Sequence, residues 1–176
     1  NAFEEVNYRP ADSIRGTNFG WRCYEGFNNY NTNGCGPAAS YTPPGLVYPT
    51  PPRASVTGGT VYRGETWTDL QGWYLACDFY SGRWYKMKYN AGTQVFDTSS
   101  QVLSPTGIVD YGEDQEGEMF AACLNNGTVY RITTGAPIDY VFTGNGNWNK
   151  ASNWKKRVVP PAVLPAGCRI LIRPAD

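Results

Sequence analysis

The chain has 176 residues, and its 15 Lys+Arg balance 15 Asp+Glu, so no basic stripe or charged tail marks a nucleic-acid partner. It contains no histidine, which excludes a Ser-His-Asp triad within it and removes the commonest metal ligand. No window approaches the roughly eighteen apolar residues of a membrane span, so no transmembrane segment is expected. The chain begins in polar sequence at Asn1 with no visible signal peptide, which predicts a mature or truncated piece of a longer polypeptide.

Aromatic residues make up 15% of the chain, and 20 glycines and 13 prolines accompany them. Aromatic strands separated by Gly, Pro and Asn turns are typical of all-β proteins. We therefore expect an all-β fold.

The first 53 residues offer one short alternation, AFEEVNY, and then a long polar loop over residues 21–53. The run ASYTPPGLVYPTPP carries too many prolines for a central strand. The segment GWRCYEGFNNYNTNGC has no aliphatic residue, so it cannot form its own core. A bond between Cys23 and Cys35 would substitute for that core, removing about 3 kcal/mol of unfolded-chain entropy. We expect this bond, and with it a secreted or cell-surface location.

Three further cysteines leave alternatives open. Cys77 and Cys123 occupy similar places on two predicted strands and could form a second bridge if their Cα atoms lie within about 7 Å. Cys168 would then be unpaired, or paired with a residue elsewhere in the polypeptide. A cytosolic chain with five inert buried thiols is the other interpretation.

From Ser55 onward the sequence predicts short strands with a turn about every eight to twelve residues, as in sandwiches, barrels and propellers. The expected strands are SVTGGTVYRG with a glycine bulge, GWYLACDF, RWYKMKYN, QVFDTSSQVLS, GIVDYGED, EMFAACL and TVYRIT. Two similar hairpins, DFYSGRWYKMK and CLNNGTVYRIT, lie about 45 residues apart. Such a repeat favours consecutive blades of a propeller.

A boundary is expected near Thr134–Pro137, dividing a domain over 1–134 from a region over 135–176. The second region has a different composition, with WNKASNW, a basic run, PP and the strand RILI. About 40 residues are too few for an independent domain. We expect a linker and the truncated start of a further β-rich domain.

Five motifs, in this order, resemble the glucose/sorbosone dehydrogenase family of six-bladed propellers, typified by pyrroloquinoline-quinone (PQQ)-dependent soluble sugar dehydrogenases. They are AFEEVN, NFGWRCYEG, SVTGGTVYRG, LQGWYLACDFYSGRWYKMK and GEDQEGEMFAACLNNGTVYRI. The resemblance covers about residues 1–134. It implies a partial propeller comprising the last two to three blades, with Cys23–Cys35 closing a loop seen in many members. The remainder is similar to β-rich modules of secreted bacterial surface proteins.

The resemblance also implies PQQ and calcium as cofactors, and a catalytic histidine on an early blade that this chain lacks. The family's quinone-contacting lysine falls at Tyr80 or Ser81, and its Arg-x-Arg pair falls nearest Gly107 and Val109. Quinone carboxylates need cationic, preferably bidentate partners. Tyr80 and Arg83 are therefore the remaining cofactor-binding candidates.

The carboxylates suggest candidate metal ligands. Asp78, Asp110 and Asp114 lie near strand ends that face related turns, where they could bind a metal or simply cap the turns. The acidic run GEDQEGE, which includes Glu118, suits calcium, or else forms a solvated hairpin turn.

Aromatic side chains surround the expected disulfide: Tyr24, Phe27, Tyr30 and Tyr41. Beside Asn and Gly they could stack on sugar rings, or they could pack as a small core for the loop. Trp148 and Trp154 pose the same alternative, and their spacing favours a structural role.

Two functions follow. The first is a fragment of a secreted PQQ-dependent aldose dehydrogenase-like protein, which oxidises a sugar at the anomeric carbon with catalytic groups supplied by the missing half. The second is a non-catalytic propeller that acts as a surface scaffold or carbohydrate-binding module. The expected partners are the remainder of the polypeptide, a sugar or glycan, and other surface or secretion-system proteins.

Overall fold

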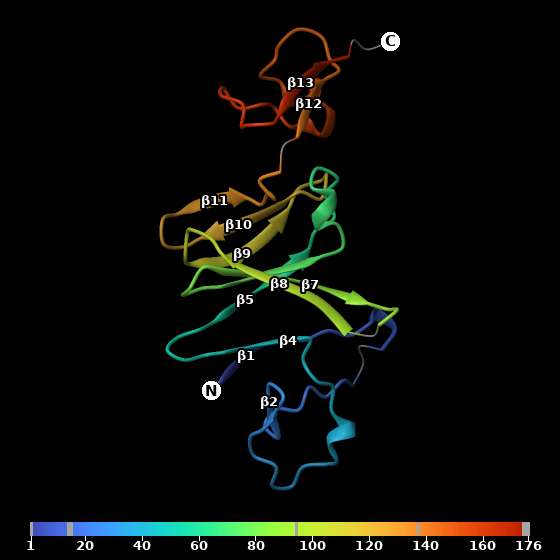
Figure 1. The fold of residues 1–176 in the computed structure, drawn as a ribbon, viewed down its shortest axis with the longest axis vertical. Helices are drawn as coiled ribbons and strands as arrows, with labels where there is room; N and C mark the ends of the chain where they lie inside the picture. Colours follow the sequence, from blue (N-terminus) through green and yellow to red (C-terminus); the bar gives the residue numbers. More distant parts are fainter. Residues whose placement is uncertain (1, 14–15, 94, 137, 174–176) are drawn as a thin grey trace.

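The computed structural model describes residues 2–13, 16–93, 95–136 and 138–173. This part of the chain is all-β, as predicted, and its small sheets stack as layers along the long axis of the molecule (Figure 1). None of the sheets formed by these residues closes on itself. No helix among them has the length and apolar character to cross a bilayer.

The first layer pairs β1 (Phe3–Val6) with β4 (Leu46–Pro49) in antiparallel fashion. A small hairpin of β2 (Tyr24–Glu25) and β3 (Asn28–Asn29) lies between them in sequence. The expectation of an irregular loop throughout 21–53 was therefore wrong at the β2–β3 hairpin and at β4. In the described residues β4 pairs with β1 alone, so it is an edge strand, where proline is tolerated. Two 3-10 turns complete this region, η1 (Ala11–Ser13) and η2 (Ala38–Ser40).

A four-stranded antiparallel sheet forms the second layer. Its strands pair in chain order: β5 (Val56–Val61), β6 (Tyr74–Asp78), β7 (Arg83–Asn90) and β8 (Val95–Val102), with η3 (Thr68–Leu70) between β5 and β6. The register of β5 against β6 shifts between Thr57 and Thr60, which confirms the predicted bulge. Here Gly59 lies so close to Leu75 that a Cβ atom would overlap the Leu75 carbonyl oxygen.

The third layer contains three antiparallel strands: β9 (Ile108–Glu113), β10 (Met119–Cys123) and β11 (Thr128–Arg131). The β6–β7 and β10–β11 hairpins, predicted to be copies of one unit, each turn at a glycine with a φ of 65°, Gly82 and Gly127. The second and third layers meet along their first strands, where the Thr57 hydroxyl donates to the Ile108 carbonyl at 2.8 Å.

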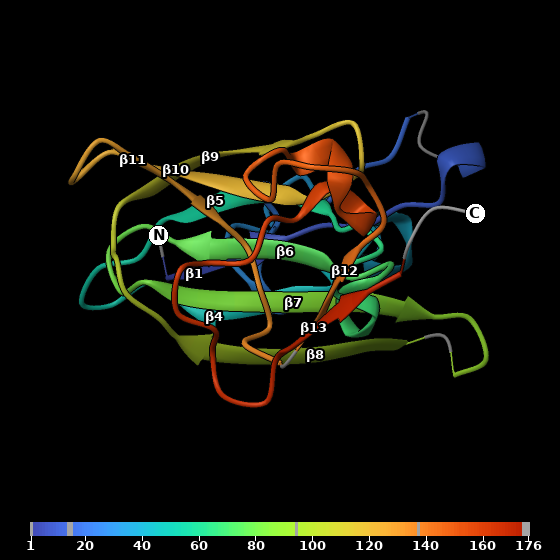
Figure 2. The same cartoon turned by 90° about the horizontal axis from the view of Figure 1, so that it is seen from above.

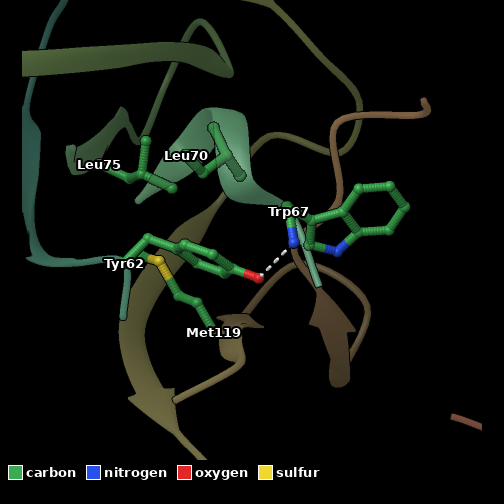
Figure 3. Close-up of a cluster of buried hydrophobic side chains, with 5 residues drawn as sticks. All are labelled: Tyr62, Trp67, Leu70, Leu75 and Met119. Carbon is green, nitrogen blue, oxygen red and sulfur yellow. Dashed lines mark hydrogen bonds between the residues drawn. The ribbon is translucent and has the colours of Figure 1, made fainter. Parts of the chain in front are cut away.

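Apolar side chains fill the space between the second and third layers. Alternate residues of β10 are buried, because successive side chains of a strand point to opposite faces. One cluster comprises Tyr62, Trp67, Leu70, Leu75 and Met119 (Figure 3). A second comprises Cys77, Ile108, Ala121 and Cys123. The Trp67 backbone N–H donates to the Tyr62 hydroxyl at 3.1 Å and joins η3 to this core.

Residues 138–173, here called the terminal module, lie over the stacked sheets when the molecule is seen from above (Figure 2). The module contains a parallel pair of strands with two 3-10 turns between them: β12 (Asp139–Phe142), η4 (Ala151–Asn153), η5 (Lys155–Arg157) and β13 (Arg169–Ile172). Its own small core is formed by Tyr140, Phe142 and Trp154.

Candidate functional site

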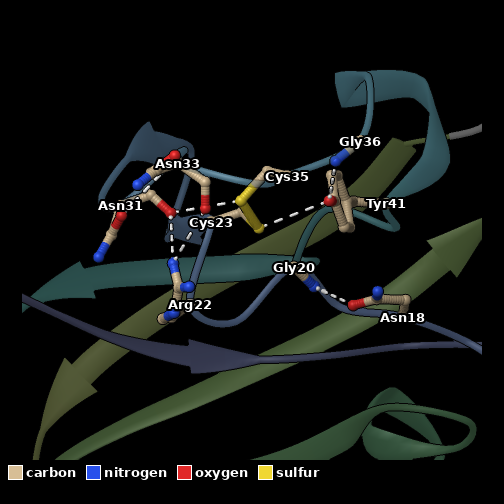
Figure 4. The surroundings of a disulfide bond; sticks show 9 residues. All are labelled: Asn18, Gly20, Arg22, Cys23, Asn31, Asn33, Cys35, Gly36 and Tyr41. Atoms are coloured by element: carbon tan, nitrogen blue, oxygen red, sulfur yellow. Dashed lines mark hydrogen bonds between the residues drawn. A yellow bond between two sulfur atoms is a disulfide. The ribbon is translucent and has the colours of Figure 1, made fainter.

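The predicted bond between Cys23 and Cys35 is present, with Cα atoms 6.0 Å apart (Figure 4). The Tyr41 hydroxyl lies beside it, accepting a hydrogen bond from the Gly36 N–H at 2.8 Å. The same hydroxyl lies 3.5 Å from Cys23 Sγ and is the donor in that contact, since a bonded sulfur carries no proton. The disulfide therefore closes the middle of the polar segment, named here the clamped segment (residues 20–41), and Tyr41 contacts the bond from the end of that segment.

Polar contacts rather than apolar ones shape the clamped segment. The Arg22 guanidinium donates from Nη1 to the carbonyl oxygens of Asn31 and Asn33, at 3.2 and 3.4 Å (Figure 4). The backbone N–H groups of Tyr30 and Asn31 donate to the carbonyls of Cys23 and Arg22. These bonds pair backbone groups that have no sheet partner, so the segment has a defined shape without a core.

Glutamates attach the clamped segment to the first layer. The buried Glu25 accepts from the backbone N–H of Ala2 at 2.6 Å, and Glu5 on β1 accepts from the N–H of Gly26. Gly26 has a φ of 62°, and a Cβ atom there would lie 2.9 Å from the Val47 side chain. Only glycine suits this turn, and it brings the hairpin directly against β1 and β4.

Three aromatic side chains of this segment are left in solvent: Trp21, Phe27 and Tyr30 are 68%, 67% and 57% exposed. The rings of Trp21 and Tyr30 stack with centroids 5.3 Å apart and an interplanar angle of 22°. We call this pair the aromatic platform. Exposed apolar patches on monomeric proteins often belong to interaction sites, so this pair is a candidate binding surface.

For the aromatics around the disulfide, packing is confirmed for Tyr24 and Tyr41, and stacking on sugar rings stays a prediction for the exposed Phe27 and Tyr30. Tyr24 and Tyr41 pack on each other with centroids 5.3 Å apart, while Phe27 and Tyr30 face solvent. Trp21 was missed as a site residue. Its only signal was its position directly before the first cysteine, within the run NFGWRC.

The chemistry of the platform suits a flat, neutral, hydroxylated ligand. Aromatic faces stack on the apolar faces of sugar rings, and amide groups both donate and accept hydrogen bonds. Exposed asparagines line the same segment at Asn28, Asn29, Asn31 and Asn33.

Asp78, a predicted metal ligand, is instead part of the framework. It is 1% exposed and accepts hydrogen bonds from the Tyr48 hydroxyl, the Ser55 N–H and both the N–H and hydroxyl of Ser81. Burial alone would raise the pKa of Asp78, but these hydrogen bonds outweigh it and the pKa is lowered. The carboxylate thus joins β4, β5 and the β6–β7 turn.

The acidic run also has a structural explanation. Asp114 caps the β9–β10 turn by accepting from the N–H groups of Glu116 and Glu118, at 3.0 and 2.9 Å. Asp110 is exposed on β9. Within the described residues, no three acidic or cysteine side chains gather where they could hold a metal ion. The geometry therefore does not bring Asp78, Asp110 and Asp114 together as one site.

Glu118 departs from the solvated-turn interpretation, because it is only 2% exposed. Its carboxylate accepts from the Tyr62 hydroxyl at 2.8 Å and the Thr66 N–H at 3.0 Å, and it pairs with the Arg131 guanidinium at 3.2 Å. The alternation along β10 places Met119 on the buried face, so the sequence pattern could not identify a buried Glu118 beside it.

The candidate quinone-binding residues contact their own neighbours. Tyr80 is half-exposed, with the Arg53 guanidinium 4.4 Å above its ring. The Arg83 guanidinium lies 3.4 Å from the Ser100 hydroxyl on β8. Gly107 and Val109 offer no cation. A quinone carboxylate needs cationic donors, preferably a guanidinium fork. Of the candidate places, only Arg83 and the Arg53 beside Tyr80 carry such a group, so PQQ binding stays a prediction.

The second predicted bridge is absent in the described residues. Cys77 and Cys123 are both buried as free thiols, and each Sγ points to a carbonyl oxygen near its own strand, that of Asp78 at 3.4 Å and of Thr106 at 3.3 Å. Burial raises the pKa of the Cys77 thiol to about 12. Cys168 is also free and is half-buried in the terminal module.

The paired tryptophans of the terminal module have the structural role that their spacing favoured. Trp154 is buried, and its Nε1 donates to the Trp148 carbonyl oxygen at 2.6 Å. Trp148 stacks on Phe142 with centroids 5.0 Å apart. The Asn153 side chain donates to two carbonyls of the same turn and fixes it.

Comparison with known proteins assigns no family or function to this chain. No family model matches the chain, and no solved structure matches it significantly.

Proposed function

We propose that this chain belongs to a secreted or cell-surface protein of the propeller type, and that it binds neutral carbohydrate through the aromatic platform without catalysing a reaction. The observation that carries the proposal is the exposed Trp21–Tyr30 stack on a segment fixed by a disulfide. The disulfide also supports an oxidising compartment.

The layered sheets support the propeller part of the proposal. Two successive antiparallel meanders stack through their first strands, β5 and β9, and their hairpins turn at matching glycines. Radially repeated small sheets of this kind are the building principle of propellers. The resemblance of residues 1–134 to sugar dehydrogenase propellers points the same way.

The rigidity of the clamped segment supports a binding role for the aromatic platform. Binding to a flexible loop costs about 0.5–1.5 kcal/mol for each side chain that must be ordered. The disulfide and the Arg22 hydrogen bonds meet that cost before a ligand arrives. A platform ordered in advance can therefore bind a weakly interacting sugar chain with useful affinity.

Affinity electrophoresis through gels containing amylose, β-glucan, xylan or mannan tests the proposal. We expect at least one polymer to retard the chain, and Trp21→Ala and Tyr30→Ala each to weaken that retardation about tenfold, or about 1.4 kcal/mol. Tyr80→Ala, which removes a half-exposed tyrosine elsewhere, is the matched control and should be retarded normally. Unretarded wild type on all four polymers, or platform variants that behave as wild type, would contradict the proposal.

A second candidate is the aldose dehydrogenase-like function, which the order of the five resembling motifs favours. Its quinone, calcium and proton-accepting groups would have to come from other parts of the polypeptide. Dye reduction by the intact polypeptide with PQQ, calcium and a panel of aldoses tests it. Reduction would support an enzyme, and no reduction with any aldose would remove this candidate.

A further inference from the structure

A cleft of about 670 Å³ lies between the terminal module and the segment that contains Thr66 and the start of η3. β12, η5 and the start of β13 form one side, and Thr66 and Thr68 form the other. Its volume lies within the range of small-molecule sites, about 300–1,000 Å³. The terminal module, which forms one side of the cleft, lies at the opposite end of the stack from the clamped segment (Figure 1).

The lining of the cleft is positively charged. It contains three cations, Lys155, Lys156 and Arg169, and one carboxylate, Asp139. Arg169 donates to Asp139 from two nitrogens, at 2.8 and 2.7 Å, so this pair contributes little net charge. Lys155 is exposed, and no contact ties it to another described residue, so its ammonium group is available to a ligand.

The conformation of η5 places cations at the cleft at some cost. Lys156 and Arg157 have φ values of 60° and 52°, in the left-handed region that is unfavourable for residues other than glycine. In return the Lys156 ammonium donates to the Glu65 carbonyl oxygen, and Arg157 pairs with Glu116 at 3.3 Å. These two contacts join the module to the sheets and keep the cleft between them.

The remaining lining is suited to a sugar ring rather than to a bare ion. The exposed Thr68 presents a small polar side chain, whereas the Thr66 hydroxyl is buried, and Ile138 and Val158 form an apolar wall. We propose that this cleft binds an acidic saccharide unit, with its sulfate or carboxylate facing Lys155 and its ring against Ile138 and Val158. The inference does not depend on the aromatic platform, because it uses none of the same residues.

Saturation-transfer NMR on the full chain tests it, with glucose 6-sulfate as the probe and glucose and inorganic sulfate as comparisons. We expect glucose 6-sulfate to bind at least tenfold more tightly than either comparison, since it alone fills both parts of the cleft. A hydrogen bond to a charged group is worth enough that Lys155→Gln should weaken binding about tenfold.

The matched control is Lys150→Gln, which removes an exposed lysine of the same module that does not line the cleft. It should bind as the wild type does, and Trp21→Ala should too, which separates this cleft from the platform. Absence of binding, equal affinity for inorganic sulfate or for glucose, or wild-type affinity in Lys155→Gln would each overturn the proposal. Both lysines are exposed, so both variants are expected to fold.

Discussion

The stacked sheets and the clamped segment reach a defined structure by different means. Between the second and third layers, side chains such as Tyr62, Ile108 and Met119 are almost completely buried. The clamped segment leaves three of its aromatic side chains, Trp21, Phe27 and Tyr30, in solvent. Its order comes from one covalent bond and several polar contacts. Because the clamped segment does not depend on burying these aromatic side chains for its order, they are available to contact a ligand.

The largest effect on stability is expected from removing the buried carboxylate of Glu118 in the stacked sheets. Glu118→Ala should lower the free energy of unfolding by about 3 kcal/mol, because it leaves the buried Tyr62 hydroxyl without its acceptor and the partly buried Arg131 without its counter-charge. Urea unfolding measures the change. The matched control is Glu113→Ala, which removes an exposed ion pair with Arg63 and should cost less than about 1 kcal/mol. An equal loss of unfolding free energy in the two variants would contradict the distinction between a buried and an exposed ion pair.

Removing the disulfide should destabilise the clamped segment and leave the stacked sheets unchanged. The double variant Cys23→Ser, Cys35→Ser restores about 3 kcal/mol of chain entropy to the unfolded segment. Hydrogen exchange should therefore accelerate at the Tyr30 and Asn31 amides, which donate within the segment, and stay slow in β6 and β10. Uniform acceleration throughout the sheets would show that the two regions are not separate.

Acid should weaken the sheets through Glu118. Burial alone would raise the pKa of Glu118, but hydrogen bonds from Thr66 and Tyr62 and the charge of Arg131 outweigh burial and lower it. A carboxyl group whose folded pKa is below its ordinary value of 4.5 stabilises the fold above that pH. This stability is lost as the pH falls through the folded pKa. Urea midpoints measured from pH 7 to 3 should therefore fall more steeply for wild type than for Glu118→Gln, and parallel curves would refute this.

The smallest expected effect is a difference in the rate at which the free thiols are chemically labelled. At pH 8, iodoacetamide should modify Cys168 before Cys77, whose pKa is raised to about 12 by burial between the sheets. Mass spectrometry after brief labelling identifies the modified residue. Rapid labelling of Cys77 in the folded chain would indicate that the layers open readily.

Much of the sheet region could be predicted, because its strands alternate and its turns contain glycine. RWYKMKYN coincides with β7, and the bulge at Gly59 follows from its paired glycines. Strand β4 was missed because prolines surround it, and an edge position cannot be read from one sequence. The disulfide was predictable from a segment without aliphatic residues.

The site was harder to predict than the fold. Local sequence indicates that Tyr24 and Tyr30 are aromatic, but only the folded segment decides that one packs and the other is exposed. Glu118 is buried through contacts with Tyr62, Thr66 and Arg131, partners far away in sequence. No periodic pattern encodes such contacts, and the cleft at Lys155 likewise depends on two distant segments meeting.

The central claim is that the disulfide holds the aromatic platform in a binding-competent form. The most direct test compares the retention of the oxidised chain and of the Cys23→Ser, Cys35→Ser variant by the same neutral polysaccharide, with sheet integrity verified by hydrogen exchange. We predict about a tenfold loss of affinity in the variant, although Trp21, Phe27 and Tyr30 are all still present. Equal affinity of the two proteins would contradict the claim.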